Sequence, residues 1–383
     1  MDEQLFVSES VTPGHPDKLC DGIADAVVDA LLRQDPRASA EVECAVASGI
    51  VFLAARVAAH AAVDMPAIAR EVLAEAGYLG ASGFDARRCS ILTSLTDVPI
   101  DPIDADADAQ AADEHLNAFG FACDDTAVLM PMPIMLAHRV ARAFDAARAS
   151  GALGAMSPDA KAQVAVLYRD GRVAGIGGVT LVCGGEPEAL AALPGRLREA
   201  VLTPAFAGGP LALPEDCPVL VNPGGVRRGG GPATHPGLTG RKPGIDTYGE
   251  FSRQPQAALS GKDPGSIDRL GAYAARWAAK NIVAAGLARR CEVHLCYAAG
   301  QAAPASLRVH SQGTGLMPDS MLAARLAALA DFRPGPLLRR MRLRERVAEA
   351  PPPGFCRALA AYGHVGREGL PWEALDIAEA LRG

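Results

Sequence analysis

The chain has 383 residues, of which 49% are hydrophobic and 21% charged, and its net charge is -7. This length is enough for a large buried core and more than one folding unit. The acidic balance argues against nucleic acid as a partner, so a site for a polyphosphate must gather its basic residues locally.

The first hundred residues alternate between strand-like and helix-like patterns. In chain order they predict a strand at 5–7, a helix at 20–34, paired strands at 42–57, a helix at 65–76 and a strand at 90–95. The helices are predicted from apolar residues at helical spacing, and the first is ended by Asp35-Pro36. This order predicts an α+β layer.

The same alternation returns twice, without a repeat at the level of individual residues. Later elements are predicted as strands at 163–168 and 173–181, helices at 186–201 and 271–285, strands at 292–298 and 307–311, and a helix at 321–328. Two long loops separate these rounds: an acidic one at 97–113 and a glycine-rich one at 223–240. Loops of this length in a compact domain are usually functional or disordered.

The nine cysteines predict reduced thiols. Their number is odd, and no two have the C-x-x-C spacing that is typical of zinc or redox sites. The N-terminus lacks the charged and then apolar pattern of a secretion signal, and no apolar run is long enough to span a bilayer. These features predict a soluble, cytoplasmic protein with no membrane partner.

Several short basic and acidic segments indicate a site for a polyphosphate and its Mg²⁺. The turn GHPDK at 14–18 combines an imidazole, a carboxylate and an ammonium beside a helix N-terminus. GLTGRK at 237–242 places two cations after glycines that let the backbone approach phosphate oxygens, although the Walker A spacing is absent. The residues that could neutralise a triphosphate are Lys18, Lys161, Arg241, Lys242 and Lys262, and Asp17 and Asp268 could hold Mg²⁺.

A set of motifs in a fixed order connects these segments with a known family. The motifs are SESVTPGHPDK at 8–18, DAKAQ at 159–163, GLTGRK at 237–242, DTYG at 246–249, SGKDP at 260–264, AYAAR at 272–276, KNIVAAG at 280–286 and AYGHVGR at 361–367. Together they resemble the S-adenosylmethionine synthetase (methionine adenosyltransferase) family over nearly the whole chain.

The resemblance implies a fold of three similar α/β-layer domains around a pseudo-threefold axis, at 3–101, 113–230 and 232–373. It implies an enzyme in which the sulfur of methionine attacks C5′ of ATP. The tripolyphosphate is released and then cleaved. Mg²⁺ and K⁺ are the implied ions. The active sites would lie between two subunits of a homodimer, often paired into a dimer of dimers.

The resemblance also implies roles for individual residues. His15 would donate a hydrogen bond where the C5′–O bond breaks. The leaving tripolyphosphate would be held by Lys161, Arg241, Lys242 and Lys262; Mg²⁺ by Asp17 and Asp268; and K⁺ by Glu43. The nucleotide contacts would come from Lys18, Asp113, Asp159 and Arg227. This is electrostatic catalysis on a leaving group that gains charge.

The chain departs from the family pattern in the amino-acid pocket. The family's glutamate, glutamine and aspartate fall on Arg56, Val98 and His235. Arg56 would repel an ammonium and attract a carboxylate or phosphate. An adenine-stacking phenylalanine of the family falls on Arg227, and an arginine can still stack on a base. The sequence therefore indicates methionine or an altered, possibly anionic, relative as the acceptor.

Three alternatives remain open at this point. The three pocket changes could be drift with compensation elsewhere. The same triphosphate site could serve an ATP triphosphatase or phosphotransferase, in which water or another acceptor attacks phosphorus. The chain could also be a non-catalytic, nucleotide-binding partner subunit, although the retained phosphate cations and metal carboxylates argue against this.

Overall fold

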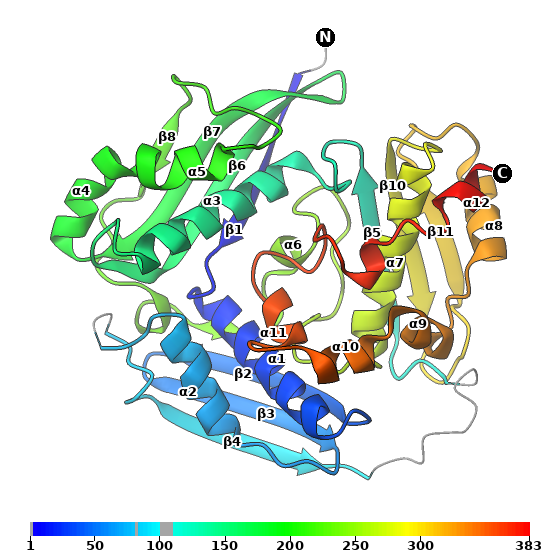
Figure 1. Cartoon of the computed structure of the whole chain (residues 1–383), viewed down its shortest axis with the longest axis horizontal. Helices are drawn as coiled ribbons and strands as arrows, with labels where there is room; N and C mark the ends of the chain where they lie inside the picture. Colours follow the sequence, from blue (N-terminus) through cyan, green and yellow to red (C-terminus); the bar gives the residue numbers. More distant parts are fainter. Residues whose placement is uncertain (1–2, 81–82, 100–109) are drawn as a thin grey trace.

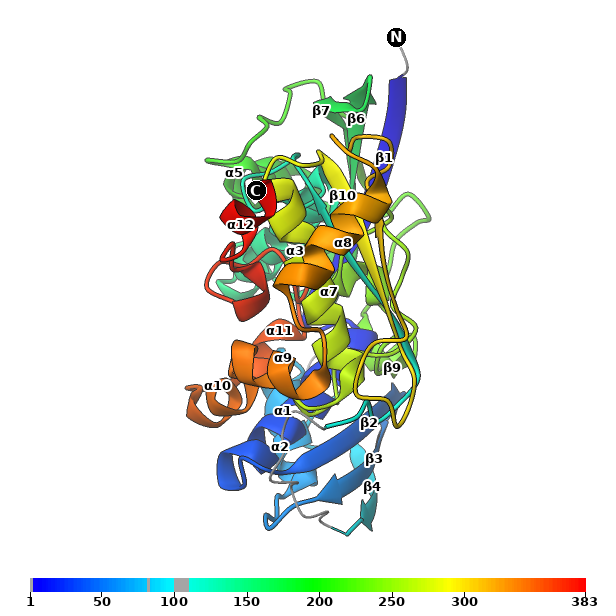
Figure 2. The same cartoon turned by 90° about the vertical axis from the view of Figure 1, so that its right-hand side faces the viewer.

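The computed structural model describes residues 3–80, 83–99 and 110–383. These residues form three sheets, each with helices against it, arranged around a common centre (Figure 1). In the view turned by 90°, the strands of the three sheets lie towards one side, whereas α9 to α12 lie towards the other (Figure 2). The predicted α+β fold of three layered units is therefore confirmed.

The first sheet has the order β4-β3-β2-β9. Its strands are β4 (Ser90–Asp97), β3 (Ile50–Ala58), β2 (Ser39–Ala47) and β9 (Gly237–Leu238), and its helices are α1 (Pro16–Gln34) and α2 (Met65–Glu75). β2 and β3 are antiparallel and strictly alternate, so that residues such as Val42 and Leu53 are buried beneath α1. The opposite face of this sheet is exposed.

The second and third sheets have the orders β1-β6-β7-β8 and β11-β10-β5. The second contains β1 (Glu3–Val11), β6 (Met156–Arg169), β7 (Arg172–Gly185) and β8 (Val219–Val221), with α3 (Met132–Ala149), α4 (Pro187–Leu197), a π-helical turn (Arg198–Leu202) and α5 (Thr203–Phe206). The third contains β5 (Leu116–Cys123), β10 (Arg290–Tyr297) and β11 (Ser306–His310), with α7 (Ile267–Ala284), α8 (Asp319–Leu329) and α12 (Ala378–Arg382). Short helices fill the centre and one side: α6 (Pro243–Asp246), α9 (Pro334–Met341), α10 (Leu343–Glu349) and α11 (Phe355–Leu359).

The sheets exchange strands between distant parts of the sequence, which corrects one prediction. The strand predicted at 5–7 exists as β1, but it does not join the layer that follows it. All nine residues of β1 pair with β6, from Glu3 opposite Arg169 to Val11 opposite Lys161. The free edge of β2 is instead covered by β9. The domain boundaries at 3–101, 113–230 and 232–373 stay predictions.

Other elements follow the sequence patterns, with changes at their ends. α1 begins at Pro16, four residues before the predicted start, because the side chain of His15 caps it and proline suits the first helical turn. The helix predicted at 186–201 consists of α4 and a π-helical turn, and α5 continues the helical segment beyond the predicted end. The acidic loop predicted at 97–113 falls largely on residues 100–109, which lie outside the described residues.

The cysteines are all free, and eight of the nine are buried, as the sequence predicted. Across the described part of the chain, no helix combines the length and the apolar character that crossing a bilayer requires.

A buried ionic network joins α7 to the C-terminal segment. Glu373 accepts hydrogen bonds from Arg276 (2.8 Å), Lys280 (2.7 Å) and the backbone N–H of Gly366 (2.7 Å). Burial opposes the charged carboxylate, but the two cations hold the pKa of Glu373 below its ordinary value. The stabilisation is therefore complete above the pKa of an unfolded glutamate, about 4.3, and is lost as the pH falls through the lower pKa of the folded state.

Glu373→Gln should lower the free energy of unfolding by about 3–5 kcal/mol, because Arg276 and Lys280 would remain buried without their anion. The measurement is urea unfolding at pH 7.5, at one fixed protein concentration. Glu368→Gln, at an exposed position, is the matched control and should change stability by less than about 0.5 kcal/mol. Equal effects of the two variants would show that the network contributes nothing specific.

Candidate functional site

His15 lies in the turn that joins β1 to α1 and is almost completely buried, with 1% of its surface exposed. Its Nδ1 accepts the backbone N–H of Asp17 at 3.2 Å. Burial lowers the pKa of His15 to about 3, so that the ring is neutral. A neutral ring whose Nδ1 accepts must carry its proton on Nε2. Nε2 has no hydrogen-bond partner among the described residues, and it can therefore donate to a ligand.

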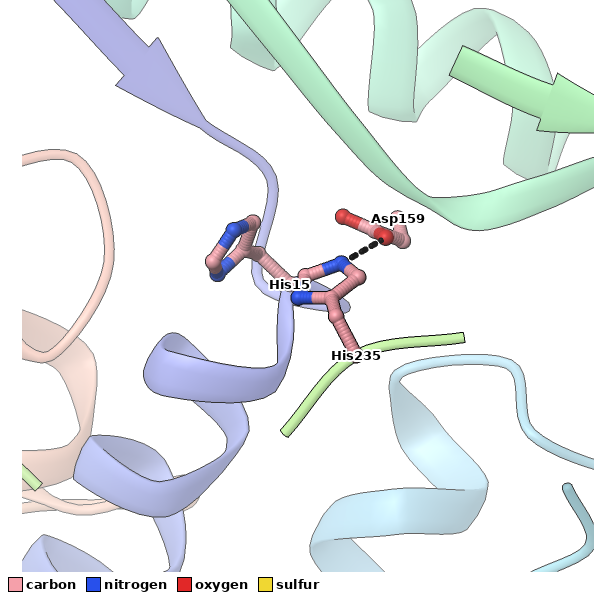
Figure 3. Close-up of side chains that lie close together, drawn as sticks. All are labelled: His15, Asp159 and His235. Atoms are coloured by element: carbon pink, nitrogen blue, oxygen red, sulfur yellow. Dashed lines mark hydrogen bonds and ion pairs between the residues drawn. The ribbon is translucent and has the colours of Figure 1, made fainter. Parts of the chain in front are cut away.

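Asp159 and His235 lie beside His15 (Figure 3). His235 Nε2 is 2.8 Å from Oδ2 of Asp159, and the rings of His15 and His235 are 5.0 Å apart, centroid to centroid. Burial alone would raise the pKa of Asp159, but the hydrogen bonds from His235 and from the backbone N–H of Gly231 lower it overall. Asp159 is therefore an ionised carboxylate.

Three cations surround this group. Lys161 lies within β6, opposite Val11. The charges of Lys161 and Lys242 both act to lower the pKa of His15 further, which shows that they are close to it. Lys242 Nζ is 2.7 Å from Oε1 of Glu9. Arg241 is half exposed, and its Nε is 3.8 Å from Oδ1 of Asp17.

These residues are named the His15 cluster: His15, Asp17, Asp159, Lys161, His235, Arg241 and Lys242. Its elements are held by backbone contacts across the sheets. Asp17 Oδ1 accepts the N–H of Leu238 on β9 at 3.1 Å, and this fixes the GLTGRK segment beside α1. Gly237 has to be glycine, since a Cβ there would lie 2.2 Å from the backbone of Pro16.

A second group lies around Lys262, on the open face of the first sheet. Lys262 Nζ contacts Glu41 on β2 and is 3.7 Å from Oδ2 of Asp268 in the first turn of α7. Burial raises the pKa of Asp268 to about 6. Asp113 accepts the N–H of Ile267 at 3.0 Å and so lies at the start of the same helix.

Glu43 and Arg56 complete this second group. Arg56 on β3 is directly opposite Glu41, and Glu43 is two residues farther along β2. Burial raises the pKa of Glu43, whereas the charge of Lys262 opposes that shift. The residues Glu41, Glu43, Arg56, Asp113, Lys262 and Asp268 are named the Lys262 cluster.

Within one chain the two clusters are separate. Ala45 of β2 pairs with Leu238, beside the His15 cluster, and Glu41 pairs with Lys262. Four residues of strand span about 14 Å. The predicted phosphate cations and metal carboxylates are therefore brought together in two groups and not in one.

Three predicted residues lie outside both clusters. Lys18 has a fully buried side chain that is paired with Asp21 at 2.9 Å and with Asp246, so its charge is already neutralised away from the surface. Val98 follows β4 and bonds through its N–H to the carbonyl of Val57 at 2.9 Å. Arg227 is exposed on the glycine-rich loop.

Two carboxylates of the candidate site were missed from the sequence. Glu9 and Glu41 are the ion-pair partners of Lys242 and Lys262, two of the predicted phosphate cations. Glu9 lies within the first motif, and Glu41 faces the same way as Glu43 in a strand with period two. Only the pairing of distant strands reveals their partners.

The carboxylates suit the metals that the sequence implies. Mg²⁺ on a nucleotide is typically held by one or two carboxylates together with the phosphates. Asp17 and Asp268, one in each cluster, match that pattern. Burial raises the pKa values of Asp268 and Glu43, and a bound cation would favour their charged forms.

Comparison with known proteins identifies the family. The S-adenosylmethionine synthetase models match in order: the N-terminal domain at 3–98, the central domain at 109–226 and the C-terminal domain at 229–374. The chain belongs to the S-adenosylmethionine synthetase family. This confirms the family predicted from the motifs, and with it an enzyme of the transferase class.

Curated members of the S-adenosylmethionine synthetase family resemble the chain over its full length. The S-adenosylmethionine synthase of Synechococcus sp. (strain JA-3-3Ab) is 41% identical over 99% of this chain and 97% of the relative. That of Desulforudis audaxviator (strain MP104C) is 41% identical over 100% of this chain and 98% of the relative.

Proposed function

We propose that the chain is an ATP-dependent adenosyltransferase. A nucleophile attacks C5′ of ATP, and the tripolyphosphate leaves as one unit and is then cleaved. The observation that carries the proposal is the neutral, buried His15, whose Nε2–H is free. The charges of Lys161 and Lys242 act on its ring, and Arg241 lies beside Asp17 in the same cluster. A neutral donor beside cations suits an oxygen that gains negative charge as its bond to C5′ breaks.

The two clusters support a homodimer as the active unit. The open face of the first sheet carries a row of apolar residues in register, with Leu238, Ala45, Phe52 and Leu92 on adjacent strands. Phe52, Leu92 and Leu238 are between 43% and 53% exposed. Such a strip is typical of a subunit interface. Pairing of two copies through this face would bring the His15 cluster of each subunit opposite the Lys262 cluster of the other, and a dimer of dimers could follow.

The proposed ligand contacts divide between the clusters. Lys161, Arg241 and Lys242 would hold the tripolyphosphate from one side, and Lys262 from the other. Asp17 and Asp268 would each hold a Mg²⁺, which neutralises phosphate charge, and Glu43 would hold K⁺. Asp113, Asp159 and Arg227 would contact the adenosine. Lys18 is left out of this set, since its ammonium is already satisfied by Asp21 and Asp246.

The proposed acceptor carries an anionic group that Arg56 recognises. Arg56 is exposed, and no ion pair of its guanidinium is found within residues 3–80, 83–99 and 110–383. Its cross-strand neighbour Glu41 is engaged by Lys262. Arg56 is therefore available to a carboxylate or phosphate. His235, in the other cluster, would join Arg56 and Val98 in one acceptor pocket only across the proposed dimer.

The decisive experiment is incubation with ATP, Mg²⁺ and K⁺, with methionine, with an anionic analogue such as 3-(methylthio)propionate, or with neither. Mass spectrometry then identifies the products. A 5′-adenosylated sulfur compound with tripolyphosphate, or the phosphate and diphosphate formed from it, supports the proposal. ADP without an adenosylated product would favour phosphoryl transfer. ATP unchanged under every condition would favour a non-catalytic subunit.

Lys161→Ala should lower kcat by about 10²–10³-fold, because one cation at the leaving group is lost. The measurement is steady-state release of phosphate and diphosphate. Arg172→Ala, which removes an exposed cation at the far end of β7, is the control and should retain the normal rate. An unchanged rate in Lys161→Ala would refute its role.

Phe52→Glu should convert the dimer to a monomer and abolish turnover, because a charge would be buried in the apolar strip. Light scattering after size-exclusion chromatography measures the mass. Met321→Glu, which adds the same charge to a half-exposed site on α8, should leave both the mass and the activity unchanged. A Phe52→Glu protein that remains an active dimer would exclude this face as the interface.

Arg56→Glu combined with His235→Asp should raise kcat/KM for methionine at least tenfold, because both changes restore negative charge for the α-ammonium group. Kinetics with methionine and with 3-(methylthio)propionate should move in opposite directions. If the methionine kinetics do not change, the assignment of the acceptor pocket is wrong.

A further inference from the structure

The hydrogen bond between His235 and Asp159 fixes which nitrogen of His235 carries the proton. Asp159 is ionised, and its Oδ2 also accepts the N–H of Gly231 at 2.9 Å. A carboxylate only accepts hydrogen bonds, so His235 Nε2 must donate across the 2.8 Å contact. In the neutral ring, Nδ1 then carries the lone pair.

Nδ1 of His235 is free to act on a ligand. In the part of the chain that the structure describes, no hydrogen bond to this atom is found. The side chain is 29% exposed, and Figure 3 shows its second ring nitrogen directed away from Asp159, on the side of His15. An imidazole that is oriented by a carboxylate and has an open second nitrogen is the arrangement of a general base.

The two neighbouring imidazoles therefore have opposite capacities. His15 accepts through Nδ1 and can donate from Nε2, whereas His235 donates through Nε2 and can accept at Nδ1. Their rings are 5.0 Å apart and tilted by 57°, so that both lie beside the same small region of the site. A donor suits the leaving oxygen, and an acceptor suits a nucleophile that must lose a proton.

We propose that His235 is a general base for adenosyl transfer to a thiol, with Asp159 holding it in the required tautomer. This inference rests on the adenosyltransferase function proposed above. The S–H bond breaks and its proton goes to Nδ1 of His235; the sulfur forms a bond to C5′; and the C5′–O bond breaks with its electron pair leaving on tripolyphosphate. The imidazolium then returns its proton to water.

The chemistry selects a thiol over other acceptors. A thioether has no proton to lose, so a base gives it no advantage. A thiol, with an ordinary pKa of about 8.5, is acidic enough for a neighbouring imidazole to take its proton as the sulfur attacks. An alcohol is far less acidic, and an imidazole would deprotonate it poorly.

Two pairs of acceptors test the proposal, because the members of each pair differ only by a proton or a methyl group on sulfur. They are 3-mercaptopropionate with 3-(methylthio)propionate, and homocysteine with methionine. The full chain is incubated with ATP, Mg²⁺ and K⁺, and the adenosylated products are quantified by mass spectrometry. In the pair that fits the pocket, we expect kcat/KM for the thiol to exceed kcat/KM for the corresponding methyl thioether at least tenfold.

Variants at His235 separate base catalysis from binding. His235→Gln keeps a donor for Asp159 but removes the basic nitrogen, and the ratio of thiol to methyl-thioether rates should fall by about 10²-fold or more. Added imidazole should restore thiol turnover in His235→Ala, since the site is partly open. His310→Gln, at an exposed position on β11, is the control and should leave the ratio unchanged.

Each other outcome overturns the assignment in a distinct way. Methyl thioethers that react as fast as thiols would refute the role of His235 as a base, while the proposed adenosyl transfer would stand. An unchanged ratio in His235→Gln would do the same. ATP cleavage with no adenosylated product from any acceptor would refute the proposed function itself.

A bound transition metal is the remaining alternative. His15, Asp159 and His235 offer ligand atoms that all lie within 4.8 Å of one another. If 1,10-phenanthroline, which does not remove Mg²⁺, abolished thiol turnover and Zn²⁺ restored it, the thiolate would be formed on a metal and not by His235. Turnover that is insensitive to this chelator supports the base.

Discussion

The site depends on a close contact between the turn after β1 and the strand β6. A Cβ on Gly14 would lie 2.4–2.7 Å from Pro158, so only glycine allows the approach. Thr12 donates to the carbonyl of Pro158 at 2.5 Å, and Tyr78 donates to that of Gly14 at 2.6 Å. Because β1 belongs to one sheet and α1 covers another, this contact holds His15 between two layers, buried, neutral and beside Asp159.

In the free chain, carboxylates occupy lysines of the candidate site in a way that would let a phosphate replace them. In an acidic protein that binds a polyanion, the binding lysines must not be permanently neutralised by carboxylates of the same chain. Lys242 and Lys262 are held by Glu9 and Glu41, which are only partly buried, whereas Lys18 is sealed by two buried carboxylates. A phosphate can replace the first two partners, since exposed ion pairs contribute little stability. It cannot replace the third without leaving buried charges unpaired.

The sequence predicted the family, the main helices and strands, and most residues of both clusters, because these depend on local spacing and on motifs. It did not predict the role of Lys18, which stands beside His15 in the chain but turns inward to Asp246, more than two hundred residues away. It also placed β1 in the wrong sheet and missed Glu9 and Glu41. Both errors arise because the pairing of strands depends on segments that are far apart in the sequence. Periodicity alone carries no information about that register.

The two substitutions that distinguish the pocket lie in different clusters. Arg56 belongs to the Lys262 cluster and His235 to the His15 cluster, so in the proposed dimer they would come from different subunits and meet at one acceptor. Each replaces a family carboxylate, and together they remove two negative charges and add at least one positive charge. Drift at one of these positions would leave the carboxylate at the other position able to bind an ammonium group. Here neither Arg56 nor His235 can do so. His235 also makes a hydrogen bond to Asp159, which fixes its tautomer. An aspartate at position 235 could not make this contact, since two neighbouring carboxylates would repel each other. The pair of changes therefore supports the new acceptor proposed above.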